Sequence, residues 1–184
     1  MATKALLTVE QYEQLPDIGV RTELVDGEVI ELATGNPLHS WVRDETRSAL
    51  RGLGTGVAFA EAEFRTLGSR IRRTDVAWFA PGRFIQSDWS RPIMPVPDLA
   101  VEVVSPNDLA ADVRDKIHEY LDAGVTSVWI IYLNTREADI WNRRRGLTAV
   151  SDNLTADCLP GVAIPLERIF PGNIECESSS ASSS

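Results

Sequence analysis

A glutamate inside an apolar run is the feature of this chain with the clearest chemical consequence. Glu102 interrupts the segment 99–104, Leu-Ala-Val-Glu-Val-Val, whose composition is typical of a β-strand buried on both faces. Burying an ionised carboxylate is costly unless the group is paired with a cation or bound to a metal. Asp75 has a similar setting, because it directly precedes the apolar run 76–79. If the two strands are neighbours, the two carboxylates converge at one edge of the sheet.

Two converging carboxylates favour a divalent cation. A hard ion relieves their mutual repulsion, and Mg²⁺ is typically held by one or two carboxylates, waters and phosphate oxygens of a substrate. Such an ion activates water and stabilises charge at a phosphoryl centre. Asp75 and Glu102 therefore predict a Mg²⁺ or Mn²⁺ site for phosphoryl chemistry. A structural ion pair of Glu102 is the open alternative.

Lys116 could supply a cation to the same site. It lies on the helix expected directly after the Glu102 strand, and the polar face of that helix also carries Asp112, Asp115 and Glu119. A lysine directed at the site could position the attacking water or stabilise charge on phosphorus. Judged from the residues alone, a solvated surface lysine is the alternative.

Local patterns predict the elements that position these residues, and the clearest is a hairpin. Asp26-Gly27 stands at the centre of the alternating segment 21–32, and this dipeptide readily adopts the positive φ angles of a tight turn. Before the hairpin, Thr8 is expected to cap a short helix. After it, apolar residues at helical spacing predict a helix over 36–53.

Strands and one further helix make up the rest of the body. In chain order they are strands 57–65, 73–79 and 99–104, a helix over 109–123, and strands 127–132 and 136–141. The segment 105–108 is expected to end a strand and to cap the helix, which Gly124 closes. Antiparallel strands followed by a strand–helix–strand unit describe a mixed α/β sheet fold. Residues 1–175 are expected to form one domain, and the Ser-rich segment 176–184 a disordered tail.

The charge of the chain is unfavourable for a protein that binds nucleic acid. Over 184 residues the formal net charge is -9, whereas phosphate neutralisation needs clustered lysine or arginine. The dense basic run 143–145 is either a solvated turn or a set of phosphate contacts. The charge therefore disfavours tight, sequence-independent coating of DNA and counts against a nuclease, but it does not exclude a nuclease with a local basic patch.

Several other classes of protein are excluded or disfavoured. Ser105 has no nucleophile-elbow sequence around it, and no phosphate-cradling glycine loop occurs. No apolar run is long enough to cross a bilayer, and the N-terminus has no signal-peptide pattern. Cys158 and Cys176 have no metal-ligand spacing and suggest unpaired thiols in a reducing compartment. A cytoplasmic protein without membrane contact is expected.

A set of ordered blocks runs along the chain from about residue 8 to residue 170. The blocks are Glu23-Leu24-Val25-Asp26-Gly27-Glu28, His39, Asp75-Val76, Pro97-Asp98-Leu99-Ala100-Val101-Glu102-Val103-Val104-Ser105-Pro106, Lys116, Tyr120, Gly124-Val125 and Val128-Trp129-Ile130-Ile131. In this order they resemble the Uma-two family of putative restriction endonucleases, which belongs to the PD-(D/E)XK nuclease superfamily.

The resemblance implies a restriction-endonuclease-like αβββαβ core with an N-terminal β-hairpin, a divalent metal and phosphodiester hydrolysis. Asp75 and Glu102 match the motif acids and would bind Mg²⁺ or Mn²⁺, together with the backbone carbonyl of Val103. The superfamily lysine usually lies two residues after the glutamate, where this chain has Val104, and Lys116 on the following helix would replace it. The implied substrate is nucleic acid, DNA in the first place, and related nucleases make a homodimer plausible.

Two positions depart from the family pattern. Thr74 stands where a proline usually precedes the aspartate, which is expected to alter the start of the strand more than the chemistry. Tyr132 replaces an aspartate often found after the apolar strand, so a role for that position is in doubt.

Two further residues, Glu23 and His39, each have two alternative roles. Glu23 is either an additional acid near the metal or a hairpin residue paired with an arginine. His39 either contacts a bound water or phosphate, since its pKa suits proton transfer near neutrality, or caps a helix or packs in the core. Two other functions are also open: a non-catalytic binding or regulatory domain that retains the nuclease fold, and a dimerisation module built on the aromatic residues Trp129, Tyr132 and Trp141.

Overall fold

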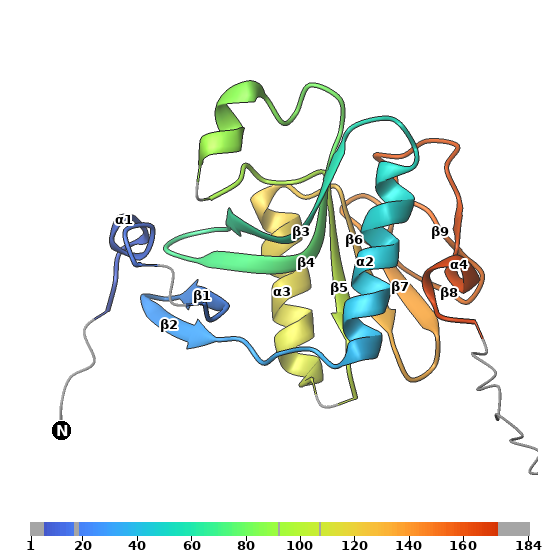
Figure 1. The fold of residues 1–184 in the computed structure, drawn as a ribbon, viewed down its shortest axis with the longest axis horizontal. Helices are drawn as coiled ribbons and strands as arrows, with labels where there is room; N and C mark the ends of the chain where they lie inside the picture. The colour runs from blue at the N-terminus through green and yellow to red at the C-terminus, as the bar shows by residue number, and fades with distance from the viewer. Residues whose placement is uncertain (1–5, 17–18, 92, 107, 173–184) are drawn as a thin grey trace, which may run out of the picture.

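A mixed eight-stranded sheet forms the centre of the computed structural model, which describes residues 6–16, 19–91, 93–106 and 108–172 (Figure 1). The strand order is β2-β1-β4-β5-β6-β7-β8, and β3 pairs with β4 beside this path. The strands are β1 (Thr22–Val25), β2 (Glu28–Glu31), β3 (Val57–Arg65), β4 (Ile71–Phe79), β5 (Leu99–Val104), β6 (Ser127–Tyr132), β7 (Glu137–Asn142) and β8 (Gly146–Val150). A second, two-stranded sheet pairs β9 (Asn153–Leu154) with β10 (Ile164–Pro165).

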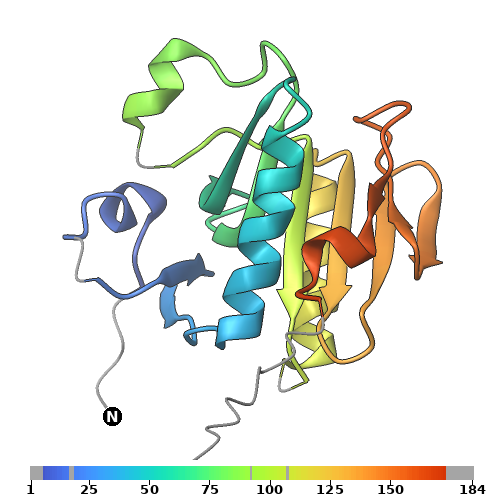
Figure 2. The same cartoon turned by 45° about the vertical axis from the view of Figure 1, so that its right-hand side comes forward.

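Two long helices cover opposite faces of the sheet. The helices are α1 (Val9–Tyr12), α2 (Pro37–Arg51), α3 (Ala110–Ala123) and α4 (Leu166–Ile169), with a 3₁₀ turn, η1 (Gln86–Ser90). Figure 2 shows α2 crossing in front of the strands and α3 behind them. The element run α2-β3-β4-β5-α3-β6 is the αβββαβ order that the family resemblance implies, and β1 and β2 form the N-terminal hairpin.

The alternation of β5 decides which face Glu102 occupies. Val101 and Val103 belong to the apolar cluster that contains residues of α2, whereas Ala100 belongs to the cluster with Ile117 and Tyr120 of α3. Successive side chains of a strand point to opposite faces, so Glu102 lies on the α3 side. β5 pairs antiparallel with β4 and parallel with β6, which places it at the centre of the sheet.

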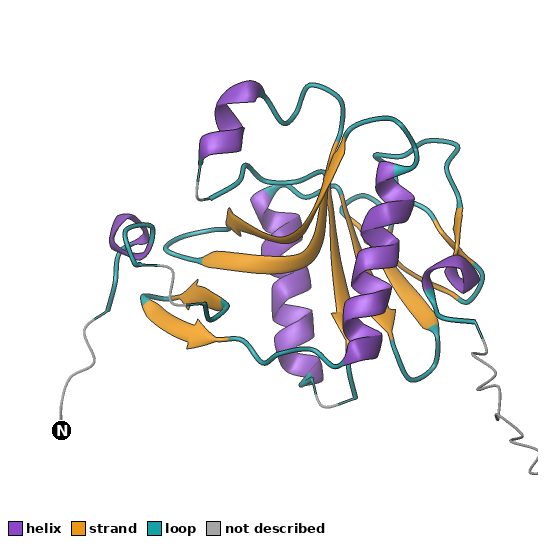
Figure 3. Ribbon diagram, in the orientation of Figure 1, coloured by secondary structure: helices purple, strands orange, loops and turns teal. Residues whose placement is uncertain are grey.

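Both long helices begin at the edge of the sheet where β5 ends (Figures 1 and 3). Asn36 caps α2, and its side chain accepts a hydrogen bond from the backbone N–H of His39 at 2.9 Å. Gly124 ends α3 with a φ of 112°, a left-handed conformation that glycine adopts without strain. Because α3 directly follows β5, its first turns are brought back over the end of that strand.

The N-terminal hairpin and short helix form as predicted. Asp26 and Gly27 have φ angles of 51° and 87°, the signs that a type I′ turn requires. Thr8 and Gln11 form a capping box at the start of α1. The hairpin joins the sheet through β1, where Leu24 pairs with Ile71 of β4.

One local prediction was wrong. The segment 105–108 does not cap α3: its N-cap is Leu109, without a side-chain hydrogen bond. Asp108 instead accepts a hydrogen bond from the backbone N–H of Ser105 at 2.7 Å, and Asn107 lies outside the described residues. β4 begins at Ile71, three residues before Thr74, and the effect of Thr74 on the start of the strand stays a prediction.

Two expectations lie outside what can be compared. The Ser-rich tail 176–184 and Cys176 are not among the described residues, so the disorder of the tail stays a prediction, as does one domain over 1–175. Across the described ranges, no helix has the length and apolar character needed to span a bilayer.

Candidate active site

Asp75 and Glu102 come from neighbouring strands and occupy one register position. The antiparallel pairing of β4 with β5 includes Val76 opposite Val101, and continuing this register places Asp75 opposite Glu102. Directly opposite residues of antiparallel strands point to the same face, with their Cβ atoms about 5 Å apart. The convergence inferred from the sequence therefore matches the strand order.

At this position side chains of β4 also bond to the backbone of β5. The Thr74 hydroxyl donates a hydrogen bond of 2.7 Å to the carbonyl of Val101, and the backbone N–H of Val103 donates one of 2.8 Å to Asp75 Oδ2. Thr74 is fully buried. Because Val103 lies beyond the paired residues and a buried backbone group needs a partner, Asp75 supplies that partner, and Thr74 adds a second contact to β5.

The backbone carbonyl of Val103 points toward the same opening. The N–H and C=O of one residue in a strand point to the same side, and the N–H of Val103 reaches Asp75. The next carbonyl, that of Val104, faces the other way and accepts a hydrogen bond from Leu133 at 3.1 Å. Asp75, Glu102 and the Val103 carbonyl thus offer oxygen atoms to one region.

The carboxylate of Glu102 lies between a tyrosine and a lysine. Tyr120 of α3 donates a hydrogen bond of 2.7 Å to Oε1, and Lys116 Nζ lies 3.6 Å from Oε2. Burial raises the pKa of Glu102 to about 7; Lys116 opposes this rise, and the charge of Asp75 adds to it. The raised pKa means that the charged form of Glu102 is unfavourable in this site, and a bound cation would stabilise that charged form.

Lys116 is not a solvated surface lysine. Its side chain is 18% exposed, and Nζ lies 2.8 Å from Glu23 Oε1 as well as 3.6 Å from Glu102. Burial by itself would lower the pKa of Lys116, but the carboxylates of Glu102 and Glu23 raise it above its usual value. The ammonium group is therefore held in its charged form beside the acids.

Glu23 is paired with an arginine and also belongs to the site. Its side chain is 2% exposed, Oε2 lies 2.9 Å from Arg72, and Oε1 accepts a hydrogen bond from the backbone N–H of Arg73 at 3.0 Å. These contacts support the arginine-paired alternative. The contact with Lys116 shows that the same carboxylate also reaches the proposed centre.

His39 lies against Asp75 from the first turn of α2. Its Nε2 is 3.3 Å from Asp75 Oδ2, and this hydrogen bond raises the pKa of His39 although burial opposes the rise. Its Nδ1 is buried and has no hydrogen-bond partner within the described ranges. Gly35 permits this packing, since a Cβ there would lie 2.6 Å from Nδ1.

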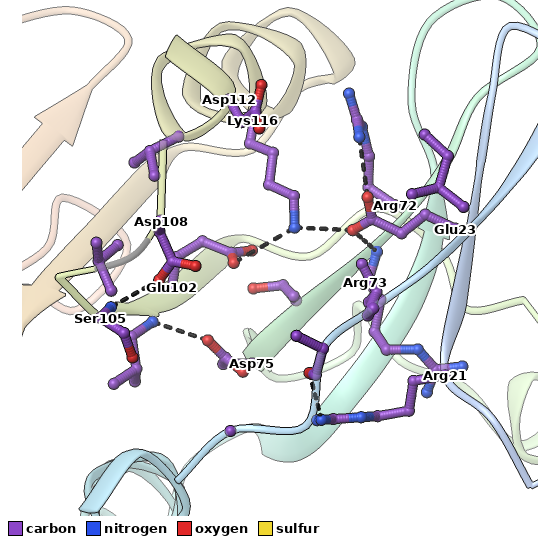
Figure 4. A pocket seen from close by; sticks show the side chains of 18 of the residues that line it. Arg21, Glu23, Arg72, Arg73, Asp75, Glu102, Ser105, Asp108, Asp112 and Lys116 are labelled. Carbon is purple, nitrogen blue, oxygen red and sulfur yellow. Dashed lines mark hydrogen bonds and ion pairs between the residues drawn. The ribbon is translucent and has the colours of Figure 1, made fainter. Parts of the chain in front are cut away.

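One cavity of about 650 Å³ is lined by Glu23, His39, Asp75, Glu102 and Lys116 and by residues at the starts of α2 and α3. Figure 4 shows four of these side chains: Glu23, Asp75, Glu102 and Lys116. Helix N-termini favour anions because their backbone N–H groups are unpaired and carry partial positive charge. The basic run 143–145 lies in the β7–β8 turn instead, where Arg143 contacts Thr126 just before β6 begins. That is the opposite edge of the sheet, so this run does not reach the cavity.

Sequence reasoning missed the arginines of the cavity. Arg21, Arg70, Arg72 and Arg73 line it, and each contacts a carboxylate. The available signal was the spacing of the last three, which precede Asp75 by two to five positions.

A second signal was the scarcity of lysine. The 18 basic residues of the chain include only two lysines, Lys4 and Lys116. Lys116 is the one of the two that lies within the described residues, and it is placed between the carboxylates of Glu23 and Glu102.

The donor set suits a hard divalent ion that keeps several waters. Among the described residues no group of three histidine, cysteine, aspartate or glutamate side chains could hold a metal. Two carboxylates and one backbone carbonyl are, however, the kind of oxygen set that Mg²⁺ accepts when waters and substrate complete its shell.

The aromatic residues at the end of the sheet are mainly core. Trp129 is fully buried and donates a hydrogen bond to the carbonyl of Thr155 at 2.8 Å. Tyr132, where the family often has an aspartate, donates one of 2.9 Å to Asp139 of β7. These contacts account for the two residues without a dimer interface.

Comparison with known proteins identifies the family. A family described as "Putative restriction endonuclease", Uma-two, matches residues 9–176. The chain is also similar in structure to a putative nuclease belonging to DUF820 from Anabaena variabilis ATCC 29413, with a TM-score of 0.76 and 17% identity over 89% of this chain and 97% of that chain. This structural likeness confirms only the nuclease-like fold. No curated protein matches the sequence. Family and fold together indicate a restriction-endonuclease-like nuclease. The chain belongs to the Uma-two family of putative restriction endonucleases.

Proposed function

We propose that the protein is a Mg²⁺- or Mn²⁺-dependent endonuclease that hydrolyses phosphodiester bonds of DNA. The observation that carries the proposal is the register of β4 and β5, which sets Asp75 opposite Glu102 beside the carbonyl side of Val103. These three groups would hold the ion. When bound, it would activate water and offset charge at the phosphoryl centre.

Lys116 has the position of a fixed cation in this reaction. It is held by Glu23 and Glu102 at 2.8 and 3.6 Å, so its charge lies beside the proposed metal ligands. A cation preorganised at that place stabilises negative charge that develops on the phosphate oxygens. Its ion pairs favour this role over that of a base.

His39 and Tyr120 would orient the two acids. His39 approaches Asp75 Oδ2, which also accepts the N–H of Val103, and Tyr120 fixes one oxygen of Glu102. Partners of this kind restrict the rotation of a ligand and maintain its geometry. Both residues would thus lower the cost of assembling the centre.

Cleavage of plasmid DNA tests the proposal. Supercoiled plasmid with Mn²⁺ should be nicked by the wild type and not by Glu102→Ala. Asp139→Asn is a matched control, because Asp139 is also a sheet carboxylate that accepts a tyrosine hydroxyl but lies on β7. Equal nicking by wild type and Glu102→Ala would reject the proposal.

The charge of the molecule supports a second candidate, a non-catalytic binding or regulatory domain. The cavity arginines and Lys116 all contact carboxylates, and the net charge is -9. Divalent-ion binding without cleavage of any DNA or RNA would favour this candidate. A homodimer and a cytoplasmic location stay predictions; light scattering tests the first.

A further inference from the structure

We propose that Arg72 is a positioning residue, which fixes Lys116 through Glu23. This inference rests on the proposed function for its catalytic meaning, but its structural content can be tested without cleavage. Arg72 itself need not touch the substrate. Its effect is exerted on the orientation of the lysine ammonium group.

Three consecutive contacts link four charged side chains into a ring that the backbone of α3 completes. Lys116 contacts Glu23 at 2.8 Å, Glu23 contacts Arg72 at 2.9 Å, and Arg72 contacts Glu119 through two hydrogen bonds of 2.7 and 2.8 Å. Glu119 lies three residues after Lys116 on α3, so the two ends of the ring occupy neighbouring helix positions. Figure 4 shows the contacts of Glu23 with Lys116 and Arg72.

The ring is shielded from solvent. The exposed fractions are 18% for Lys116, 2% for Glu23, and 11% for both Arg72 and Glu119. In such surroundings a charge left without its partner is costly, so the members constrain one another. Two cations and two anions also leave the ring without net charge.

Only a guanidinium can satisfy both acids at once. Arg72 uses Nε and one terminal nitrogen for Glu119 and the other terminal nitrogen for Glu23. This is the planar fork that a lysine cannot reproduce. The β4 arginine therefore ties Glu23 of the hairpin to α3.

Removing Arg72 should release Lys116 from its place. Glu23 would keep the backbone N–H of Arg73 and the lysine, while Glu119 would lose two of its hydrogen bonds. Glu119 is within reach of Lys116 on the helix surface and would compete for the ammonium group. The lysine would then spend less time beside Glu102.

Arg70 offers a matched control. It also contacts Glu119, but its second partner is Asp26 in the exposed hairpin turn rather than Glu23. Arg70→Met thus removes an arginine–Glu119 ion pair while leaving the link between Arg72, Glu23 and Lys116. Arg72→Met removes that link.

Lysine-selective labelling gives a readout independent of activity. With Lys4→Arg as background, Lys116 is the only lysine of the chain, so protein labelled in lysine side chains gives one ammonium signal. We expect this signal to be observed with slow proton exchange in the background protein and in Arg70→Met, and to broaden or shift to the solvated position in Arg72→Met. An unchanged signal in Arg72→Met overturns the proposal.

Steady-state cleavage supplies the second readout. In Arg72→Met we expect kcat to fall about 100-fold, with KM and the Mn²⁺ dissociation constant within about twofold, because a displaced group costs turnover more than binding. Arg70→Met should lower kcat less than Arg72→Met does, because it leaves the contacts of Glu23 with Arg72 and Lys116 in place. Equal losses of kcat in both variants would show a merely structural role.

The two proposals fail in different ways. If the wild type cleaves nothing but the Lys116 signal responds to Arg72→Met, the endonuclease fails and the positioning contact stands. If Arg72→Met does not fold, Arg72→Gln is measured instead: it keeps a hydrogen-bonding amide without the fork and adds no lysine, and the same changes are expected. A parental kcat and signal in a folded Arg72→Gln overturn the proposal.

Discussion

The hydroxyl of Thr74 donates a hydrogen bond of 2.7 Å to the carbonyl of Val101, next to the position where Asp75 faces Glu102. Val101 is also paired with Val76 of β4 in the strand ladder, so the Thr74 hydroxyl adds a side-chain hydrogen bond at the last paired position. A buried hydrogen bond of this kind contributes about 0.5–1.5 kcal/mol to stability. The site is thus stabilised by a threonine that performs no chemistry.

Thr74→Val should destabilise the fold by removing a hydrogen bond between β4 and β5. The free energy of unfolding is expected to fall by about 0.5–1.5 kcal/mol, the net contribution of a buried hydrogen bond. Urea denaturation measures it. Thr46→Val is the control, because the hydroxyl of Thr46 contacts the carbonyl of Val42 within the same helix and links no second element. Equal losses in both variants would contradict the explanation.

Glu102→Gln should abolish cleavage and yet stabilise the metal-free protein above neutral pH. Burial raises the pKa of Glu102 to about 7, so this group stabilises the fold fully below pH 4.5 and less as the pH rises through 7. The glutamine amide does not ionise, so Glu102→Gln does not lose stability in this pH range. At pH 8 its free energy of unfolding should exceed that of the wild type by about 1–3 kcal/mol. Thermal melts at pH 5 and pH 8 test this. A variant less stable than the wild type at pH 8 would show that the charged form is structural.

Gly35→Ala should impair the site by displacing His39. A Cβ at Gly35 would lie 2.6 Å from the ring nitrogen Nδ1, so the imidazole must move from Asp75. We expect cleavage to slow about tenfold or more. His39→Ala and the double variant should be equally slow, since both changes act through one contact. Gly172→Ala is the control, because a Cβ there meets no atom within 4 Å.

Glu119→Gln should weaken the fold at neutral pH and lessen its acid sensitivity. Burial tends to raise the pKa of Glu119, but the ion pairs with Arg72 and Arg70 lower it below its usual value. These ion pairs therefore contribute to the free energy of unfolding above about pH 4.5, and the contribution is lost as the pH falls through the lowered pKa. The expected loss at pH 7 is about 2 kcal/mol. Denaturation from pH 7 to pH 3 measures it, and the exposed Glu137→Gln should behave as the wild type.

Removal of divalent ions should weaken DNA binding strongly. The cavity cations are already paired with carboxylates, so few are available to replace counterions on the phosphates. In a chelator we expect a dissociation constant above about 100 µM, and with Ca²⁺ a value at least tenfold lower. Fluorescence anisotropy measures both. Tight binding in the chelator with a steep salt dependence would reveal a basic surface elsewhere.

Part of this fold can be predicted from residues that are close together in the sequence. The Asp26-Gly27 turn, the capping box of Thr8 and the end of α3 at Gly124 depend on residues within a few positions of one another. β8 was not predicted, because its residues 146–150 are largely exposed and show no clear apolar alternation. The cap expected at 105–108 was wrong because Asp108 closes a turn on Ser105.

The sequence by itself determined that a buried-strand glutamate must find a compensating charge, since that cost follows from residue type and local hydrophobicity. It also placed Asp75 and Lys116 on the elements before and after that strand. Only the tertiary structure decided which charges compensate it. Lys116 is shared between Glu102 and Glu23, and Glu23 is fixed by Arg72. These partners come from the hairpin, β4 and α3, and electrostatic contacts depend on separation in space, which local sequence does not specify.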